Sequence, residues 1–244
     1  MTKLSINLNK IALLRNQREV GYPSVTEAAV TVIDSGAHGI TVHPRPDQRH
    51  IRRTDVTELA ALLAEHHPAI EFNIEGNPTE DFLALVASVR PAQVTLVPDA
   101  PEAHTSDHGW DIAAERDRLI EVIDRLHSHD SRVSVFVDAE PDIVAAAREV
   151  GADRVELYTG PYAMAFDGPD HDAVLARYLQ AGETARDVGL ELNAGHDLNL
   201  DNLTTFRRTM PWLAEVSIGH AFTADALWLG LKRATKAYLQ ALSI

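Results

Sequence analysis

Eight short patterns of alternating apolar and polar residues run along the chain, and each is followed by a helical pattern. Strict alternation is typical of β-strands, and apolar residues at three-and-four spacing are typical of amphipathic helices. The strand candidates are residues 4–9, 39–44, 70–76, 93–99, 132–139, 154–160, 190–196 and 214–220. The helix candidates are residues 24–36, 54–67, 79–91, 110–131, 140–151, 171–189, 200–213 and 223–244.

Regular alternation of strands and helices indicates βαβ units and a parallel sheet. Eight units in 244 residues, close to the ~250 residues typical of this fold, predict an α/β protein with a (β/α)8 TIM barrel, in a single domain over residues 1–244. A doubly wound sheet would carry a Gly-rich phosphate turn after its first strand, and the sequence has none there. Residues 99–109, DAPEAHTSDHG, are interpreted as a lid.

The strand patterns also predict which side chains face the barrel axis. The apolar set of each strand must face the helices, so the polar set faces inward. Barrel interiors are usually filled by branched aliphatic residues, and buried carboxylates are costly unless they are paired or hydrated. Polar residues on many strands therefore predict a wet, charged cavity at the top of the barrel, with a structural role for deep residues such as Glu71 as the alternative.

Composition excludes several classes of function. A formal net charge of −14 argues against a nucleic-acid partner, which requires a basic face. The chain has no cysteine, which excludes disulfides and thiolate chemistry. No apolar run approaches the ~18 residues of a membrane span, and no apolar signal region is found at the N-terminus. These features predict a cytoplasmic enzyme or binding protein without membrane association.

Titratable and amide side chains gather where the predicted strands end. In a barrel of this kind, the carboxyl ends of the strands build the active site. Histidines that titrate near neutrality, together with carboxylates in a partly dry cavity, suit repeated proton transfer. The residues at these positions are Asn7, Asn9, His43, Glu75, Glu156, His196 and His220.

Basic residues follow two of the strands, and a helix start follows the last; all three suggest anion binding. The stretch ITVHPRPDQRHI (40–51) supplies Arg45, Arg49 and His50, and phosphate groups need such donors or free backbone N–H groups. Arg15 and Arg18 follow the first strand. Gly219 and a Thr223 cap at a helix start follow the last, where such barrels often bind phosphate. We therefore expect phosphorylated small molecules as partners.

These residues carry a resemblance that covers nearly the whole chain. The segments NLNKIALLRNQR, GAHGITVHPRPDQRHI, NIEGNPTEDFLAL, GADRVELYTGPYA, LELNAGHDLN and VSIGHAF resemble the pyridoxine 5′-phosphate synthase family of vitamin B6 biosynthesis. The resemblance implies a homo-octamer of (β/α)8 barrels. It implies an enzyme that condenses 3-amino-2-oxopropyl phosphate with 1-deoxy-D-xylulose 5-phosphate to give pyridoxine 5′-phosphate, phosphate and water. No metal and no organic cofactor is implied.

The resemblance also implies a role for each site residue. His43 and the glutamate of the third strand would accept protons, His196 would donate one, and Glu156 would stabilise charged intermediates. The residues that would hold the amino-ketone phosphate are Asn7, Arg18, Asp197, Gly219 and His220. The residues that would hold the sugar phosphate are Asn9, Lys10, Arg45, His50 and Thr105.

The match leaves an ambiguity and two departures. The glutamate of the third strand could be Glu71 or Glu75; the spacing of NIE to TED and a position at the top of the barrel favour Glu75. The family commonly has Asp-His where this chain has Asn9-Lys10. Asp197 stands where glycine is usual, and a carboxylate near phosphate is unfavourable unless it points away.

Two other functions fit the same residues. A metal-dependent barrel aldolase or epimerase could use His43, Glu75, His196 and His220 as ligands of zinc or manganese. A non-catalytic barrel that binds a phosphorylated metabolite would bind ligands without turnover. Chelation distinguishes the first from the synthase, and turnover distinguishes the second.

Overall fold

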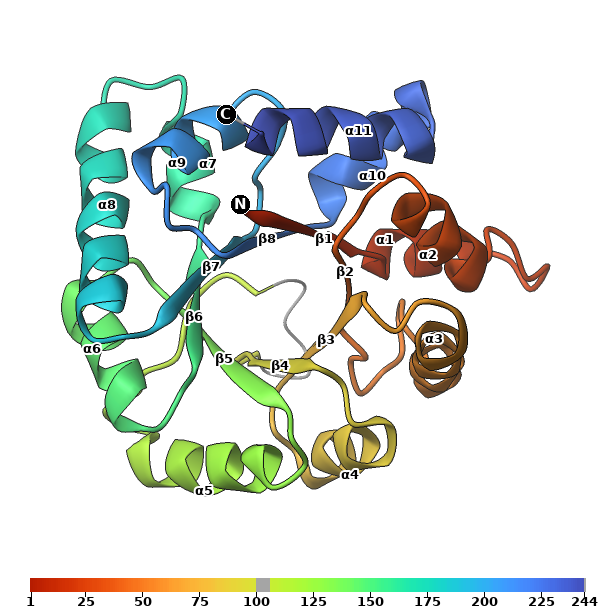
Figure 1. Cartoon of the computed structure of the whole chain (residues 1–244), viewed down its shortest axis with the longest axis horizontal. Coiled ribbons are helices and arrows are strands. Elements are labelled where there is room, and N and C mark those ends of the chain that lie inside the picture. Colours follow the sequence, from red (N-terminus) through yellow and green to blue (C-terminus); the bar gives the residue numbers. More distant parts are fainter. Residues whose placement is uncertain (100–105, 244) are drawn as a thin grey trace.

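Eight parallel strands close into a barrel in the computed structural model, which describes residues 1–99 and 106–243. Each strand pairs with the next along the chain, and β1 pairs with β8 through Leu4–Val216 and Ile6–Ile218. This confirms the predicted (β/α)8 fold (Figure 1). The strands are β1 (Lys3–Asn7), β2 (Gly39–Val42), β3 (Glu71–Gly76), β4 (Gln93–Leu96), β5 (Arg132–Val137), β6 (Arg154–Tyr158), β7 (Glu191–Gly195) and β8 (Glu215–Ile218).

Helices surround the barrel, and within the described residues there are more of them than the eight expected. They are α1 (Asn9–Asn16), α2 (Val25–Ile33), α3 (Arg53–His66), α4 (Glu80–Val89), α5 (Arg116–His127), α6 (Pro141–Glu149), α7 (Gly160–Ala165), α8 (His171–Asp187), α9 (Leu203–Thr209), α10 (His220–Leu229) and α11 (Leu231–Leu242). None of these helices is long and apolar enough to cross a lipid bilayer.

The differences from the expected helices have local causes. Helices α1 and α7 are too short to show a clear apolar stripe, and both begin within two residues of a strand end. The helix expected over residues 223–244 is two helices, because Gly230 adopts φ 76° and ψ 151° and turns the chain between α10 and α11. The first of these begins at His220, so Thr223 lies inside its first turn. The prediction of Thr223 as the cap was wrong.

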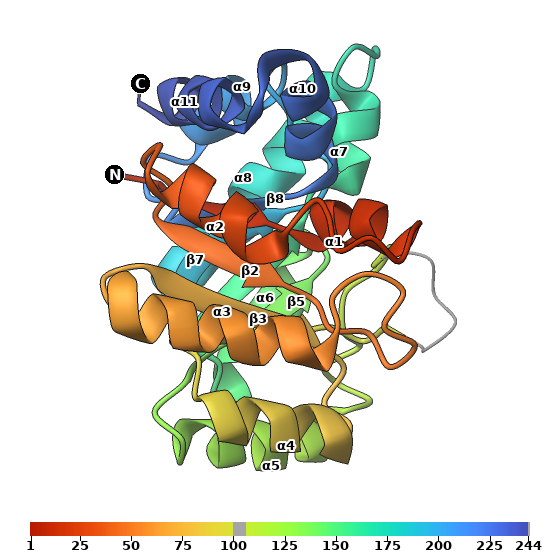
Figure 2. The same cartoon turned by 90° about the vertical axis from the view of Figure 1, so that its right-hand side faces the viewer.

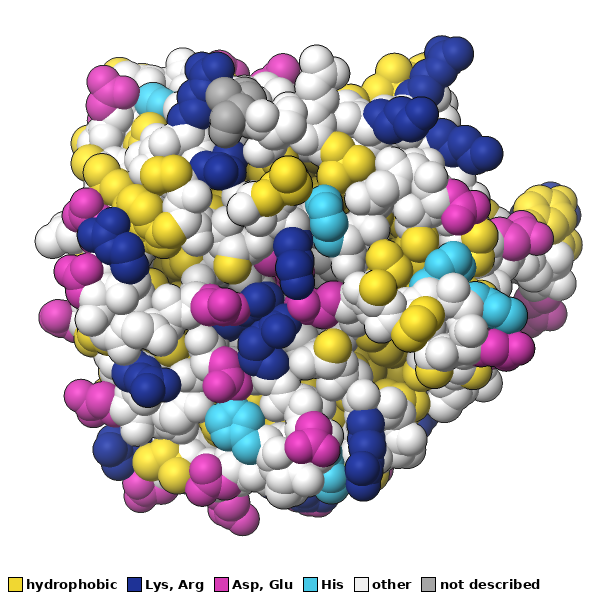
Figure 3. Space-filling view, in the orientation of Figure 1, with side chains coloured by type: hydrophobic (Ala, Val, Ile, Leu, Met, Phe, Trp, Pro, Cys, Tyr) yellow, Lys and Arg dark blue, Asp and Glu magenta, His cyan; other side chains and the backbone are white. Residues whose placement is uncertain are grey.

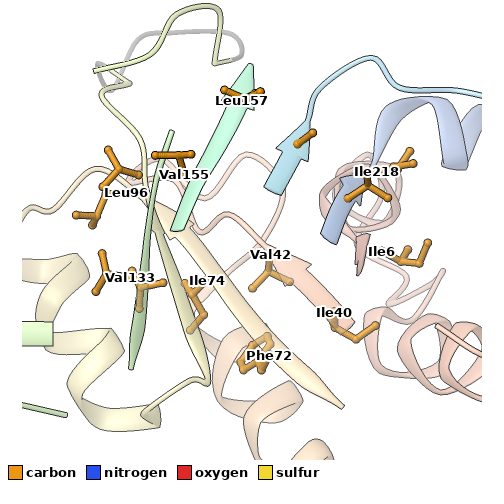
Figure 4. Packing of buried hydrophobic residues seen from close by; sticks show 14 of the residues in the cluster. Ile6, Ile40, Val42, Phe72, Ile74, Leu96, Val133, Val155, Leu157 and Ile218 are labelled. Carbon is orange, nitrogen blue, oxygen red and sulfur yellow. The ribbon is translucent and has the colours of Figure 1, made fainter. Parts of the chain in front are cut away.

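The alternation within the strands sorts side chains as predicted. Apolar residues such as Ile40 and Val42 have no exposed surface and pack in one core with helix residues such as Val56 and Leu59. Figure 4 shows part of this layer on neighbouring strands. Burying a side chain of this size contributes about 1.5–3 kcal/mol, which holds the helices on the barrel. The polar residues of the same strands are left for the interior.

An ionic network fills the lower end of the barrel, where the strands begin. Glu71 forms ion pairs with Arg132, with Lys3 at 3.3 Å and with Arg154 at 3.5 Å, and Arg154 pairs with Glu191 at 2.6 Å. Basic and acidic side chains lie together at the centre of this face in Figure 3. Burial alone would raise the pKa of Glu71, but the Arg132 hydrogen bond and the surrounding cations lower it. Glu71 therefore has the ion-pair partners expected of a deep residue with a structural role.

The loops that follow the strands gather at the opposite end of the barrel (right-hand side of Figure 2). The segment after β2 is anchored there by Arg15 of α1, which donates hydrogen bonds to Asp55 in α3 and to the His50 carbonyl oxygen. Arg15 is 9% exposed and its charge is compensated. Its interpretation as a phosphate ligand was wrong, because the guanidinium fixes the segment that carries Arg45 and His50.

Candidate functional site

A cavity of about 650 Å³ opens at the carboxyl ends of the strands. Every predicted site residue lines it except Arg18 and Thr105. Arg18 is exposed and does not line the cavity, and Thr105 lies outside the described residues. Residues that sequence reasoning did not assign to a site also line it, namely Leu13, Val97, Ser106, Phe136, Tyr158 and Ser217, together with Arg49 of the basic cluster.

Two buried carboxyl groups lie at the floor of this cavity. Burial raises the pKa of Glu75 to about 7; Asp99 adds to the rise, while His196, Arg45 and a Ser217 hydrogen bond oppose it. Burial and the charges of Glu75 and Glu215 raise the pKa of Glu156 well above its usual range. Two nearby carboxyls that favour different protonation states near neutrality can serve as base and acid.

The local chain makes room for both carboxyls. Asn7 Nδ2 donates a hydrogen bond to Glu75 Oε2 at 3.3 Å, which links β1 to β3. A Cβ on Gly195 would lie 2.2 Å from Glu156 Oε1, so only glycine leaves space for that carboxyl in its present place. Glu75 lies in the cavity while Glu71 lies at the other end of the barrel. The geometry therefore favours Glu75 as the glutamate of the third strand.

His43 is held in place beside Glu75. Its Nδ1 is 3.9 Å from Glu75 Oε2, and its backbone N–H donates to Asn9 Oδ1 at 2.9 Å. Burial, and then the nearby Arg45, His50, Arg49 and His196, lower the pKa of His43 well below its usual range. The imidazole is therefore neutral near pH 7 and can accept a proton.

The cations after β2 face the same cavity from its side. Arg45 pairs with the buried Asp99, which also accepts a hydrogen bond from Ser106 at 2.6 Å. Burial, followed by the charges of Arg45, Lys10 and Arg49, lowers the pKa of His50 to about 4. His50 Nδ1 accepts the Ile51 N–H at 2.9 Å, so the neutral ring carries its proton on Nε2. This cluster can donate hydrogen bonds to a phosphate.

His196 and Asp197 form a corner after β7. Both adopt left-handed backbone conformations, with φ 84° and φ 57°, which glycine adopts most easily and Asp tolerates. Thr159 Oγ1 donates to the His196 carbonyl oxygen, and Asn202 Nδ2 donates to the Asp197 carbonyl oxygen at 3.1 Å. Asp197 Oδ2 lies 3.6 Å from His196 Nδ1, and hydrogen bonding to His196 lowers the pKa of Asp197.

This conformation shows how Asp fits at position 197. Its carboxylate turns towards an imidazole, which removes part of the repulsion expected for a phosphate nearby. Within residues 1–99 and 106–243, no group of three or more His, Asp or Glu side chains is arranged to hold a metal ion.

Comparison with known proteins places the chain in context. The family model described as "Pyridoxal phosphate biosynthesis protein PdxJ" matches residues 4–243. The pyridoxine 5′-phosphate synthase of Bacteroides thetaiotaomicron is 52% identical over 238 residues, which cover 98% of each chain. That of Porphyromonas gingivalis is 49% identical over 244 residues, which cover 100% of each chain.

Solved structures of lower identity share the barrel. Phosphoribosyl anthranilate isomerase from Thermotoga maritima superposes with a TM-score of 0.64 at 16% identity, covering 99% of this chain and 98% of that one. A 3-hexulose-6-phosphate synthase gives a TM-score of 0.62 at 16% identity, covering 99% of this chain and 100% of that one. These likenesses show the fold.

Proposed function

The chain belongs to the PdxJ family of pyridoxal phosphate biosynthesis proteins, and we propose that the cavity at the top of its barrel is the active site of a pyridoxine 5′-phosphate synthase. The reaction joins 3-amino-2-oxopropyl phosphate to 1-deoxy-D-xylulose 5-phosphate and releases phosphate and water. About 50% identity to named synthases over the full chain carries this proposal. A cavity with two buried carboxyls, histidines and a cationic side suits the proton transfers and the phosphates of this chemistry.

Glu75 and His43 are the proton acceptors in this proposal. A pKa of about 7 leaves Glu75 partly ionised at neutral pH, which is the range in which a general base is most effective. His43 is neutral and 3.9 Å away, so two acceptors can serve successive steps. His196, which lines the same cavity at the end of β7, is the proton donor.

Burial and the charges of Glu75 and Glu215 raise the pKa of Glu156 well above its usual range, which favours its protonated form. A cation placed beside a buried carboxyl favours the ionised form. When an amine or iminium group of an intermediate arrives, Glu156 can therefore give up its proton and stabilise the positive charge. Gly195 is required for this placement.

The two phosphates are assigned to different sides of the cavity. Lys10, Arg45 and His50 hold the sugar phosphate; the Oδ1 of Asn9 is used by His43, so its Nδ2 remains for the substrate. Asn7, Asp197, Gly219 and His220 line the side assigned to the amino-ketone phosphate. Helix α10 begins there with Gly219 as its cap, and backbone N–H groups at a helix start bind phosphate well. Binding both reactants side by side raises their effective concentration.

The resemblance also supports a cytoplasmic homo-octamer. Light scattering on the purified protein measures the assembly directly, and a mass of one subunit would contradict it.

Turnover of the two phosphorylated substrates tests the activity. The protein should form a product with the absorbance and mass of pyridoxine 5′-phosphate and release one inorganic phosphate per turnover. Glu75→Gln serves as the matched inactive control because it keeps the shape of the side chain. A folded wild-type protein that binds both substrates and yields no product would instead favour a non-catalytic binding barrel.

A further inference from the structure

One side of the cavity is aromatic, although most of the lining is polar. Phe136 on β5 and Tyr158 on β6 line the cavity, and their ring centroids are 5.6 Å apart at an interplanar angle of 49°. The ring of His196 lies 5.3 Å from that of Tyr158, edge-on at 81°, and 6.2 Å from that of Phe136. We call Phe136 and Tyr158 the aromatic wall. Neither residue has a role in the function proposed above.

The aromatic wall lies across the barrel from the cations. In the closed strand order, β5 and β6 are opposite β1 and β2 (Figure 1), and the strands β1 and β2 lead to Lys10, Arg45 and His50. A substrate whose phosphate is held by these cations must direct its carbon skeleton towards the axis and the far side. The group that meets the aromatic wall is therefore the part of the molecule that reacts.

Contacts with neighbouring residues fix the position of Tyr158. A Cβ on Gly160 would lie 2.3 Å from the Tyr158 hydroxyl oxygen and 2.4 Å from Cζ, so the ring occupies the space that any side chain at position 160 would need. The Tyr158 carbonyl oxygen accepts a hydrogen bond from the Tyr178 hydroxyl at 2.5 Å. Phe136 is only 2% exposed and supports the ring from the side.

The chemistry of Tyr158 favours contact over proton transfer. Burial, and then the carboxylates of Asp197, Asp107 and Asp138, raise the pKa of its phenol. The group is therefore neutral throughout the working range and is a poor base. A ligand can contact the flat, partly exposed ring of Tyr158 and the hydroxyl at the edge of that ring.

We propose that the aromatic wall recognises the planar pyridine ring as it closes, so that Tyr158 and Phe136 select the product and late conjugated intermediates over the open-chain substrates. This inference rests on the proposed synthase activity. Aromatic rings pack against one another with a preference beyond that of their buried area, and neither substrate contains such a ring. Contact with the wall would thus strengthen as the reaction proceeds, which is the condition for an interaction to assist turnover.

Equilibrium binding of two products of the same reaction tests the inference. The dissociation constant of pyridoxine 5′-phosphate is measured by its fluorescence, and that of inorganic phosphate by isothermal titration calorimetry. Tyr158→Leu and, independently, Phe136→Leu should raise the dissociation constant of pyridoxine 5′-phosphate by about 3- to 10-fold, which corresponds to the free energy of one aromatic contact. Inorganic phosphate should bind as before, since it occupies the cationic side alone. Circular dichroism shows that each variant is folded.

Three further variants sharpen the result. Tyr158→Phe keeps the ring and should retain the affinity for pyridoxine 5′-phosphate, whereas Gly160→Ala should lower it by displacing the ring. Leu13→Ala removes a non-aromatic lining residue on the α1 side and should not discriminate between the two ligands. Unchanged affinity for pyridoxine 5′-phosphate in both leucine variants, or an equal loss for phosphate, overturns the inference. Wild-type protein that neither forms nor binds pyridoxine 5′-phosphate overturns the proposed function itself.

Discussion

Glu75→Gln should make the protein more stable at alkaline pH and remove a catalytic base at the same time. Glu75 is buried among groups whose net effect is to raise its pKa to about 7, from the 4.5 of an ordinary glutamate. Between these two pH values the unfolded chain loses the proton and the native protein keeps it. Native stability therefore falls as pH rises from 4.5 to 7 and is level above that range.

The size of the effect follows from the same values. Each pH unit in that range costs about 1.36 kcal/mol, so the ionised Glu75 should cost about 3 kcal/mol at pH 8. Glutamine resembles the protonated form, and its Oε1 can still accept the hydrogen bond that Asn7 donates. The variant should exceed the wild type in free energy of unfolding by about 3 kcal/mol at pH 8 and by little near pH 4.5.

Urea unfolding at fixed protein concentration, followed by circular dichroism at pH 5 and pH 8, measures this difference. Glu58→Gln, an exposed glutamate on α3, is the control and should give no difference at either pH. Turnover of Glu75→Gln should fall by roughly 10²-fold or more, and wild-type turnover should rise with pH through about 7. An equal stability difference at pH 5 and pH 8 would refute the reasoning, because Glu75 would then not be an ionisable group held in a dry site.

Further expectations concern the remaining parts of the site. Lys10→Ala should raise the Michaelis constant for 1-deoxy-D-xylulose 5-phosphate more than that for the amino ketone, and added salt should reduce the difference by screening; unchanged constants at low salt would leave Lys10 without a binding role. Gly195→Ala should lower turnover because the new Cβ meets Glu156, and activity equal to wild type would contradict the assigned position. Glu71→Ala should lower the urea midpoint while turnover persists; a folded, inactive variant would shift the base assignment to Glu71. Activity should survive exhaustive chelation, and restoration of a lost activity by one divalent ion would favour a metal-dependent aldolase or epimerase.

The parts of the fold that depend on side-chain period were predictable from the sequence. In EFNIEG, alternation places Phe72 and Ile74 outside and Glu71, Asn73 and Glu75 inside, and the structure confirms both faces. What the pattern does not contain is the set of partners that each inward side chain meets at its depth. Glu71 and Glu75 share a face, yet one meets cations at the base of the barrel and the other meets a carboxylate and histidines at the top.

Partners distant in sequence account for most of what was missed. Arg15 was interpreted as a phosphate ligand because it follows the first strand, and its partner Asp55 lies forty residues away. Alternation in VELY places Tyr158 on the inward face with Glu156, but its place beside His196 depends on Gly160 and on the corner after β7. Gly230 was read as part of one long helix, although a positive φ there divides it. The partners of Arg15 and Tyr158 follow from tertiary contacts, whereas the break at Gly230 is a local backbone conformation that glycine adopts readily.

The unusual residues of the cavity separate position from charge. Asn9 Oδ1 accepts the His43 N–H, a bond that an aspartate could also accept, so asparagine holds His43 in position without adding a negative charge. Lys10 adds a positive charge to the same lining, and Asp197 adds a negative one whose pKa is lowered first by His196 and, more weakly, by His220 and Lys10. The added charges oppose each other across one cavity. A phosphate that binds beside Lys10 therefore meets a positive charge, while Asp197 reduces the net positive charge on the side of His196 and His220.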